Sequence, residues 1–268
     1  LGRTVLRLHQ ATSGQVLYEG EDILKYSKRD MHKVQRNMQM IFQDPYSSLD
    51  PRMSIRALIS EPLEVLNKKN ELSSAQLKER VDHIMDMCGL PSHYSNLYPH
   101  ELDGGMRQRV GLARSMILDP KFIVCDEPVS ALDVSIQAQI LNLLMDLQDS
   151  HKLSYMFITH DLAVVKHISD DIMVMYMGQV VEYTSSSELF ANPIHPYTKA
   201  LLNSIPTIDL SRRNRERVTI SGEVSSPINP APGCRFAPRC PYASEKCKEG
   251  HCLKEVKPGH FVSCTEGN

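Results

Sequence analysis

Two adjacent carboxylates end a short apolar run in FIVCDEPVSALD, residues 122–133. A continuous apolar run of this length is typical of a strand buried in a parallel sheet. Such sheets bind ligands beyond the carboxyl ends of their strands, so Asp126 and Glu127 are expected to project where the sheet opens to a ligand. One acid can hold Mg²⁺, and the next can orient and deprotonate a water molecule. The alternative is that these acids only cap the helix that follows.

Other polar residues with chemical potential lie near predicted strand and helix ends. In HELDGGMRQRV, residues 100–110, two glycines open an arginine-bearing helix. Backbone N–H groups at a helix start can bind an anion, and Gly lets the anion approach; an ordinary Gly-containing turn is the alternative. Gln43 follows one predicted strand and His160 ends another. Taken singly, each is more typical of a surface polar residue than of a catalytic one.

The elements that must position these residues alternate between strand and helix. Strands are predicted over residues 13–20, 38–43, 122–128 and 154–161, and helical patterns over about 54–118 and over 135–151. Strand and helix alternating at this spacing predicts an α/β fold with a parallel sheet and crossover helices. DIMVMYMGQVVEYT, residues 171–184, predicts a hairpin that turns at Met177 and Gly178.

The composition excludes several classes of protein. The chain of 268 residues is 41% hydrophobic and 23% charged, which indicates a globular protein with room for one large domain and an appendage. A formal net charge of −2 and the lack of a basic stripe predict no nucleic-acid partner. No apolar window approaches a membrane span and no signal peptide is recognisable, so we expect a cytosolic protein. The chain begins without Met inside a helical pattern, which predicts a fragment.

The cysteines fall into two groups. Cys88 and Cys125 stand in apolar surroundings and are predicted to be small buried residues. The other five lie in the last 35 residues, which are rich in Pro and Gly: Cys234, Cys240, Cys247, Cys252 and Cys264. We expect this tail to be a separate unit with its own chemistry.

The order of the motifs resembles the ATP-binding cassette of ABC transporters. That order is a Gln after a strand, a helical insert, Gly-Gly before a helix, an apolar run ending in DEP, then SALD, and a strand ending in His-Asp. IFQDPYSSLDPRM, NPIHPYTKALLNSIP and the tail PGCRFAPRCPYASEKC are similar to the oligopeptide/dipeptide importer branch, which includes nickel and glutathione relatives. The resemblance covers essentially the whole chain.

The resemblance implies a fold and a function. Residues 1–204 would form an α/β, P-loop NTPase-like ABC nucleotide-binding domain with a helical subdomain at about 54–118, and residues 205–268 a Cys-rich extension of the oligopeptide/dipeptide-transporter type. The chain would hydrolyse ATP with Mg²⁺ on the cytoplasmic face of the inner membrane to drive peptide import, with nickel or glutathione as alternative cargo. Its partners would be a second ATPase subunit in a head-to-tail dimer, two transmembrane permease subunits and, indirectly, an extracytoplasmic substrate-binding protein.

Residue roles follow from the same resemblance. Gln43 would contact Mg²⁺ and couple to the membrane subunits, Asp126 would be the Walker B acid and Glu127 the general base. Asp133 would lie at the dimer seam and His160 near the γ-phosphate. The signature segment, which acts on ATP held by the opposite subunit, would be Leu102, Asp103, Gly104, Gly105 and Met106.

Two features depart from the family pattern. No G-x-x-x-x-G-K-[ST] occurs in the chain, although it would be expected directly before Leu1. We therefore expect the chain as numbered to lack the N-terminal strands and P-loop and to show no ATP turnover alone; a catalytically degenerate structural partner is an alternative. Asp103 stands where the family normally has Ser, and an ionised Asp repels a γ-phosphate instead of donating to it.

A non-transport cassette protein, such as one acting in DNA repair or translation, is another function class that shares the ATPase motifs. Such a protein should lack the importer-type tail.

Four tail cysteines have a spacing that suggests a metal centre. Cys234, Cys240, Cys247 and Cys264 are separated by five, six and sixteen residues. Disulfides are disfavoured in a reducing cytosol, and structural zinc sites use closer Cys pairs. An iron–sulfur cluster tolerates the wider spacing, and cysteines spaced in this way resemble the [4Fe–4S] segment of some dipeptide-importer ATPases. The cluster is the first choice and unligated thiols the second, with zinc or disulfides as the remaining alternatives; Cys252 lies outside the pattern.

Overall fold

The computed structural model divides into two compact units, Leu1–His160 and Asp161–Asn268. It describes residues 1–66, 72–205, 220, 222, 226, 228–249 and 252–264. The sequence after residue 205 loses its regular pattern and is typical of a linker; most of this stretch lies outside the described residues. Within the described part of the chain, no helix combines the length and the apolar character that a membrane span requires.

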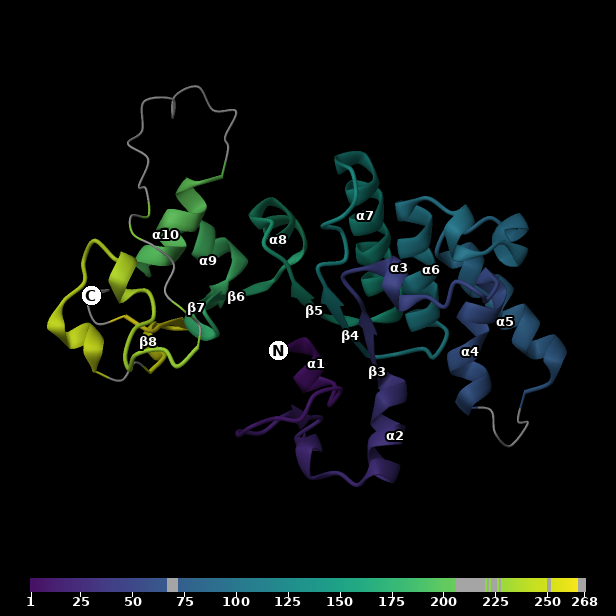
Figure 1. Ribbon diagram of the computed structural model, residues 1–268, viewed down its shortest axis with the longest axis horizontal. Coiled ribbons are helices and arrows are strands. Elements are labelled where there is room, and N and C mark those ends of the chain that lie inside the picture. Colours follow the sequence, from purple (N-terminus) through teal and green to yellow (C-terminus); the bar gives the residue numbers. More distant parts are fainter. Residues whose placement is uncertain are drawn as a thin grey trace. The chain divides into compact units, whose positions relative to one another are not determined.

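Three parallel strands form the sheet of the first unit, in the order β3-β4-β5 (Figure 1). They are β3 (Met38–Ile41), β4 (Phe122–Asp126) and β5 (Ser154–Ile158). The central strand β4 carries fully buried Ile123, Val124 and Cys125, because it is covered on both faces. The predicted parallel sheet is confirmed.

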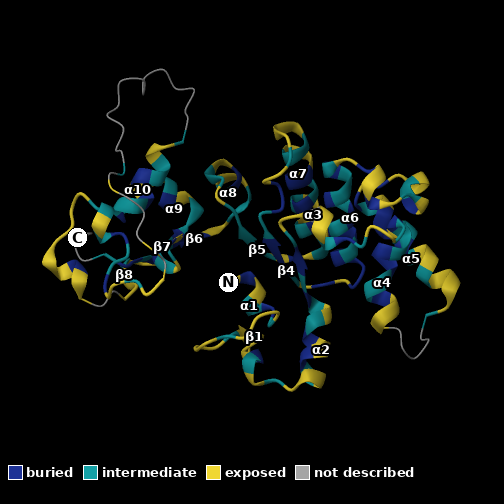
Figure 2. Ribbon diagram, in the orientation of Figure 1, coloured by how far each residue is buried: buried dark blue, intermediate teal, exposed yellow. Residues whose placement is uncertain are grey.

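Helices cover this sheet and fill the stretch between β3 and β4 (Figure 1). The helix α5 begins with a capping box between Ser73 and Gln76, which satisfies amides at its start. Buried residues gather on β4 and on α6 (Figure 2). The elements are α1 (Gly2–Val5), η1 (Ile23–Lys25), α2 (Lys28–Asn37), α3 (Pro45–Ser48), α4 (Ile55–Leu66), α5 (Ser74–Met87), η2 (Ser92–Asn96), η3 (Pro99–Glu101), α6 (Gly104–Met116) and α7 (Val134–His151).

The first helix packs closely on the sheet. A Cβ at Gly2 would lie 2.6 Å from Cγ1 of Val124, so only Gly allows α1 this approach. Met31 and Val34, on the apolar side of α2, belong to one hydrophobic cluster with Val124 and Met40. The amphipathic pattern of α2 thereby anchors the edge strand β3.

The strand predicted over residues 13–20 is shorter in the structure. Only β1 (Leu17–Tyr18) is extended, and it pairs with β2 (Glu21–Asp22). Glu19 and Gly20 take positive φ angles of 50° and 85°, which turn the chain at once. The Asp22 carboxylate then accepts the N–H groups of Val16 and Leu24. These side-chain hydrogen bonds take the place of a longer ladder.

The second unit contains an antiparallel sheet in the order β6-β7-β9-β8. The predicted hairpin is confirmed: Met177 and Gly178 have φ angles of 47° and 79°, as a type I′ turn requires. The elements of this unit are α8 (Leu162–Ile168), β6 (Asp171–Tyr176), β7 (Gln179–Ser185), α9 (Ser186–Ala191), α10 (Pro196–Asn203), η5 (Ala237–Arg239), η6 (Glu245–Lys248), β8 (Lys254–Lys257) and β9 (His260–Val262).

The tail contributes two strands that the sequence interpretation did not include. β9 pairs with β7 through Glu182 with Val262, and β8 continues the sheet. The turn between them contains Gly259 at a φ of 72°. Phe236 is buried in the core beside the residues of β6. The division of the chain near residue 204, which the resemblance implies, stays a prediction.

Candidate functional site

Glu127 is the first residue beyond β4 and has a strained backbone. Its φ of 47° is in the left-handed region, which costs a residue other than Gly about 1–2 kcal/mol. Its N–H donates to the carbonyl of Ile158 at 2.9 Å, which ties it to the end of β5. The Ser130 hydroxyl donates to its carbonyl at 3.1 Å. The turn is held from both sides, so the side chain has a defined direction.

One polar residue from beyond each parallel strand meets at this point. The amide Nε2 of Gln43, after β3, donates to Oε2 of Glu127 at 2.7 Å. The imidazole Nδ1 of His160, after β5, bonds Oε1 at 3.1 Å. The Glu127 side chain is 24% exposed, whereas that of His160 is 74% exposed. These three residues therefore lie together at the carboxyl edge of the sheet.

The two hydrogen bonds define what this cluster can do. An ionised carboxylate only accepts, so Nδ1 of His160 carries a proton and Nε2 is left for another group. The His160 ring is exposed enough to meet a solvent-borne ligand. Glu127 is held in place by uncharged or cationic donors and can take a proton from a bound water molecule.

Asp126 ends β4 and Asp133 caps the next helix. Asp126 pairs in register with Ile158 and is half-buried. Asp133 is the N-cap of α7 and accepts the N–H groups of Ser135 and Ile136 at 3.2 and 3.1 Å. The Ser135 hydroxyl, then the Ile136 amide, lowers the pKa of Asp133. The capping alternative thus applies to Asp133 and not to Asp126 or Glu127.

A magnesium ion at this edge would need ligands from outside the protein. Among the described residues, no group of three or more His, Cys, Asp or Glu side chains is arranged as a metal site. This fits Mg²⁺, which usually takes one or two carboxylates and completes its shell with phosphate oxygens and water. Asp126 is the carboxylate beside Glu127 that could serve.

The predicted anion site at the start of α6 already contains a carboxylate. Asp103 is the N-cap, and its Oδ1 accepts the Met106 N–H at 2.8 Å. Leu102 before it is buried. The two glycines after Asp103 have a packing role, because a Cβ at Gly105 would lie 2.6 Å from Ile136. A Cβ at the preceding Gly104 would lie 3.1 Å from Leu132. The start of α6 therefore lies directly against the segment that begins α7.

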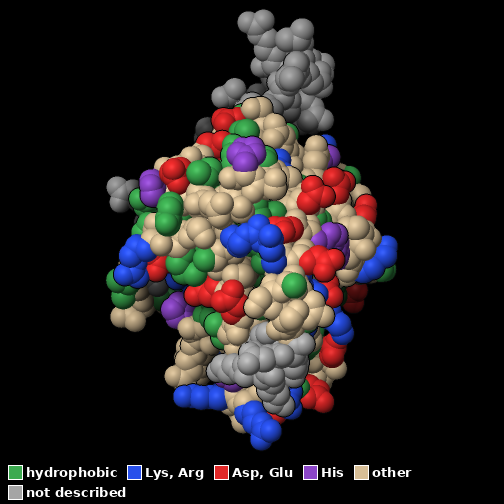
Figure 3. All heavy atoms as spheres, turned by 90° about the vertical axis from the view of Figure 1, so that its right-hand side faces the viewer, with side chains coloured by type: hydrophobic (Ala, Val, Ile, Leu, Met, Phe, Trp, Pro, Cys, Tyr) green, Lys and Arg blue, Asp and Glu red, His purple; other side chains and the backbone are tan. Residues whose placement is uncertain are grey.

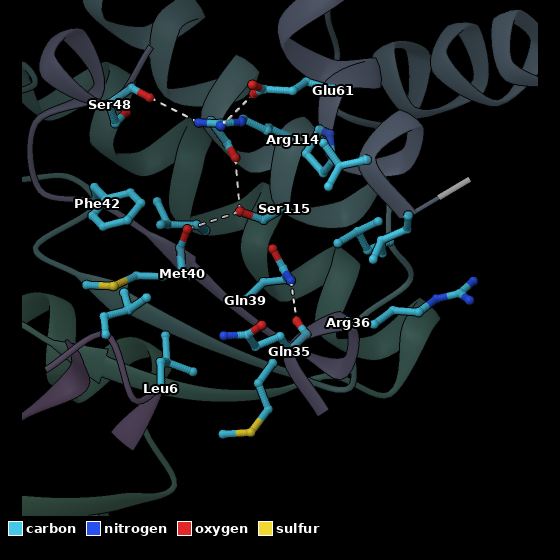
Figure 4. A pocket seen from close by; sticks show the side chains of 18 of the residues that line it. Leu6, Gln35, Arg36, Gln39, Met40, Phe42, Ser48, Glu61, Arg114 and Ser115 are labelled. Carbon is cyan, nitrogen blue, oxygen red and sulfur yellow. Dashed lines mark hydrogen bonds and ion pairs between the residues drawn. The ribbon is translucent and has the colours of Figure 1, made fainter. Parts of the chain in front are cut away.

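The first unit also contains a cavity of about 500 Å³, shown in Figure 4. Arg114 of α6 crosses its wall: one guanidinium nitrogen donates to the Ser48 carbonyl at 3.0 Å and the other to Glu61 at 2.8 Å. The Ser115 hydroxyl donates to the Met40 carbonyl at 3.3 Å. The sequence interpretation missed this network, since no motif distinguishes Arg114 from other helix-surface arginines.

Charges of both signs are interspersed on the helical face of the first unit (Figure 3). Arg56 with Asp82 and Arg114 with Glu61 are examples of ion pairs in the helical region. A face of mixed sign does not focus a strong field of one sign on a ligand.

The four tail cysteines of the predicted metal set lie in one part of the second unit. The Cys234 N–H donates to the Cys247 carbonyl at 2.9 Å. Burial raises the pKa of the Cys234 and Cys240 thiols, and the charge of the other thiols, including that of Cys264, raises it further. Cys252 is exposed. Among the described residues, no group of three or more His, Cys, Asp or Glu side chains has the arrangement of a metal site, so the cluster stays a prediction.

Comparison with protein families gives two matches. The model described as "ABC transporter" matches residues 1–130, and the model described as "Oligopeptide/dipeptide transporter, C-terminal region" matches residues 181–247. The oligopeptide transport ATP-binding protein AppF of Bacillus subtilis is 48% identical over 98% of this chain and 80% of its own length. The dipeptide transport ATP-binding protein DppF of Haemophilus influenzae is 45% identical with the same coverage of 98% and 80%.

Solved structures share the fold. cbiO1 of Clostridium perfringens, described as part of the ABC transporter complex cbiONQ, gives a TM-score of 0.62 at 26% identity and covers 71% of this chain and 73% of its own. The dimeric ATP-binding cassette MJ0796, bound to ADP and Pi, gives 0.62 at 24% identity and covers 69% and 78%. The second likeness shows the fold alone.

Proposed function

The chain belongs to the family of ATP-binding proteins of oligopeptide and dipeptide ABC transporters, and we propose that it drives peptide import by hydrolysing ATP. The observation that carries the proposal is the convergence of Gln43, Glu127 and His160, one from beyond each parallel strand. Peptides are the first choice of cargo, and nickel or glutathione is the second. The site of action would be the cytoplasmic face of the inner membrane.

In this proposal each residue of the cluster has a separate task. Glu127 accepts a proton from the attacking water, since its carboxylate is held in a fixed direction. His160 presents Nε2 toward the γ-phosphate, while Nδ1 remains bonded to Glu127. Bound Mg²⁺ would neutralise charge on the phosphates; Asp126 and Gln43 are the residues that would hold it. Together these groups position water and stabilise charge, which is the main task in phosphoryl transfer.

A second ATPase subunit is part of the proposal. Asp133 and the signature segment 102–106 would face nucleotide at a head-to-tail dimer seam. Gly104 and Gly105 support this, because they let the signature segment lie against the Asp133 segment, so both belong to one surface.

A structural, non-hydrolysing subunit is the second candidate. The observation that favours it is Asp103, a carboxylate at the start of α6 that accepts the Met106 N–H and would repel a γ-phosphate placed there.

The test separates the two candidates in the assembled transporter. Glu127→Gln should lower ATP turnover by at least about a hundredfold, the contribution of a general base, and leave ATP binding intact. Glu79→Gln, at an exposed position of α5, is the matched control and should leave turnover unchanged. Equal ATP turnover of the Glu127→Gln and Glu79→Gln transporters would favour a structural, non-hydrolysing subunit.

We also propose that a permease segment docks in the 500 Å³ cavity. Its lining includes Ser48 and Leu49 of the segment after Gln43, so an occupant would act on the loop that carries Gln43. Val65 lines the cavity and is 56% exposed. Val65→Asp should weaken assembly with the permease without changing thermal unfolding, whereas Tyr98→Asp, at an exposed residue outside the lining, should not. Normal assembly of Val65→Asp would contradict the proposal.

For the tail we propose a [4Fe–4S] cluster on Cys234, Cys240, Cys247 and Cys264. Two observations support it: the Cys234 N–H donates to the Cys247 carbonyl at 2.9 Å, which joins two segments of the set, and Cys252, outside the set, is exposed. When bound, a cluster would cross-link the loops of the tail through its thiolates.

A further inference from the structure

A small cavity of about 230 Å³ lies within the second unit, between α10 and the tail segment after Phe236. Phe236 lines it and is only 1% exposed, because its ring is surrounded by other rings. Its centroid lies 5.2 Å from that of Tyr176 and 5.4 Å from that of Tyr197. Three prolines complete the apolar walls: Pro193, Pro196 and Pro241. Proline and packed rings have few conformations, so these walls are pre-formed.

The cavity also has two cationic groups and no acid. Lys199 comes from α10 and Arg239 from the tail, and no Asp or Glu is among the described residues of the lining. Nη1 of Arg239 approaches the Tyr176 hydroxyl at 3.5 Å. With no acid in the described lining, Lys199 and Arg239 favour an anionic ligand.

We propose that this cavity binds a small organic carboxylate that carries an apolar or aromatic side chain, such as the C-terminal residue of a short peptide. The guanidinium of Arg239 suits a carboxylate because its N–H groups form a planar fork. Lys199 adds a second positive charge, and the rings and prolines contact the apolar part. The volume is below the range of about 300–1,000 Å³ for drug-sized ligands, so the occupant is one or two residues in size.

This binding requires neither ATP nor Glu127, which is in the first unit. Failure of one proposal therefore leaves the other intact. The direct test is calorimetric titration of the 268-residue chain with the dipeptide Ala-Phe, with Ala-Phe amide and with inorganic phosphate. We expect Ala-Phe to bind with a Kd of about 0.1–1 mM. The amide should bind at least about tenfold more weakly, because it lacks only the carboxylate. Equal binding of acid and amide, tighter binding of phosphate, or no binding of Ala-Phe would overturn the proposal.

Two variants locate the ligand. Arg239→Met keeps the apolar stem and removes the guanidinium, so Ala-Phe binding should fall below detection. Lys199→Gln, at an exposed position, should weaken binding at least about threefold without affecting folding. Lys246→Gln, at an exposed position outside the cavity, is the matched control and should leave the Kd unchanged.

A second readout does not depend on the Arg239 variant folding. Ala200 lines the cavity and is 5% exposed, so its methyl NMR signal should shift when Ala-Phe binds. An unshifted Ala200 signal at saturation, or the same Kd for the Lys199 and Lys246 variants, would place the ligand elsewhere and overturn the proposal.

Discussion

Gln43 and Glu127 are joined by a hydrogen bond of 2.7 Å although they lie 84 positions apart in the sequence. The bond occupies Oε2 of Glu127, while His160 occupies Oε1. Each oxygen has a further lone pair, so Glu127 can also accept a hydrogen bond from an attacking water molecule. Gln43, which holds Oε2, is the residue proposed to contact Mg²⁺.

The first prediction concerns this bond. Gln43→Ala in the assembled transporter should lower ATP turnover by about tenfold, or 1.4 kcal/mol, because a proposed Mg²⁺ contact is lost. The Mg²⁺ concentration for half-maximal turnover should rise. Gln15→Ala, which removes an exposed amide outside the cavity of the first unit, is the control. An unchanged Mg²⁺ dependence would refute the contact.

The second prediction concerns the start of α6. Asp103→Ser keeps an N-cap of similar quality, so the free energy of unfolding should change by less than about 0.5 kcal/mol. If Asp103 faces a γ-phosphate across the dimer, the same change should tighten ATP-driven dimerisation or raise turnover by up to about 1–3 kcal/mol.

Asp103→Asn separates charge from donation at the same position. It keeps the cap and removes the negative charge, so it should give part of the effect of Ser. If neither Ser nor Asn changes dimerisation or turnover, this composite site contributes little.

The third prediction concerns Arg114, which links α6 to Ser48 and to Glu61. Arg114→Met keeps the stem and should lower the free energy of unfolding by about 1–2 kcal/mol, since the link is partly exposed. Arg52→Met is the control, because its ion pair with Asp50 involves an arginine that is 87% exposed. Urea unfolding measures the free energy of unfolding of both variants. Equal losses for Arg114→Met and Arg52→Met would show that the Arg114 link stabilises the fold no more than an exposed ion pair does.

The fourth prediction concerns Glu182, which is 0% exposed in the second unit. It accepts the N–H groups of Ile194 and His195 and bonds Nε2 of His260 at 2.8 Å. Glu182→Gln should lower the free energy of unfolding by about 3 kcal/mol, because one buried donor then faces an amide N–H. Glu255→Gln on the edge strand β8 is the exposed control. A loss below about 0.5 kcal/mol for Glu182→Gln would contradict the assigned role.

The fifth prediction concerns the proposed cluster. Anaerobically purified protein should be brown and contain about four irons. Cys240→Ser should bleach it, whereas Cys252→Ser, at the exposed cysteine, should not. Colourless protein, with stoichiometric zinc or with no metal, would rule the cluster out.

The sequence alone determined the elements whose signals are local. The apolar run of β4 and the turn at Met177–Gly178 depend on neighbours within a few residues, so their patterns could be interpreted directly. The ordered motifs also located Gln43, Glu127 and His160 at strand ends. Pairing such ends at one edge follows from parallel strands, which is a general rule.

Tertiary structure decided the contacts that depend on distant packing. No local pattern indicates that Arg114 bonds Ser48 or that Glu182 bonds His260, since the two residues of each pair are more than 50 positions apart. The cavity that Arg239 lines is likewise formed by elements that are distant in the sequence. The strand at 13–20 is shorter than predicted for a related reason: the Asp22 carboxylate accepts the N–H groups of Val16 and Leu24 in place of a longer strand ladder. Hydrogen-bond partners are chosen by proximity in space, and the sequence pattern reports only proximity along the chain.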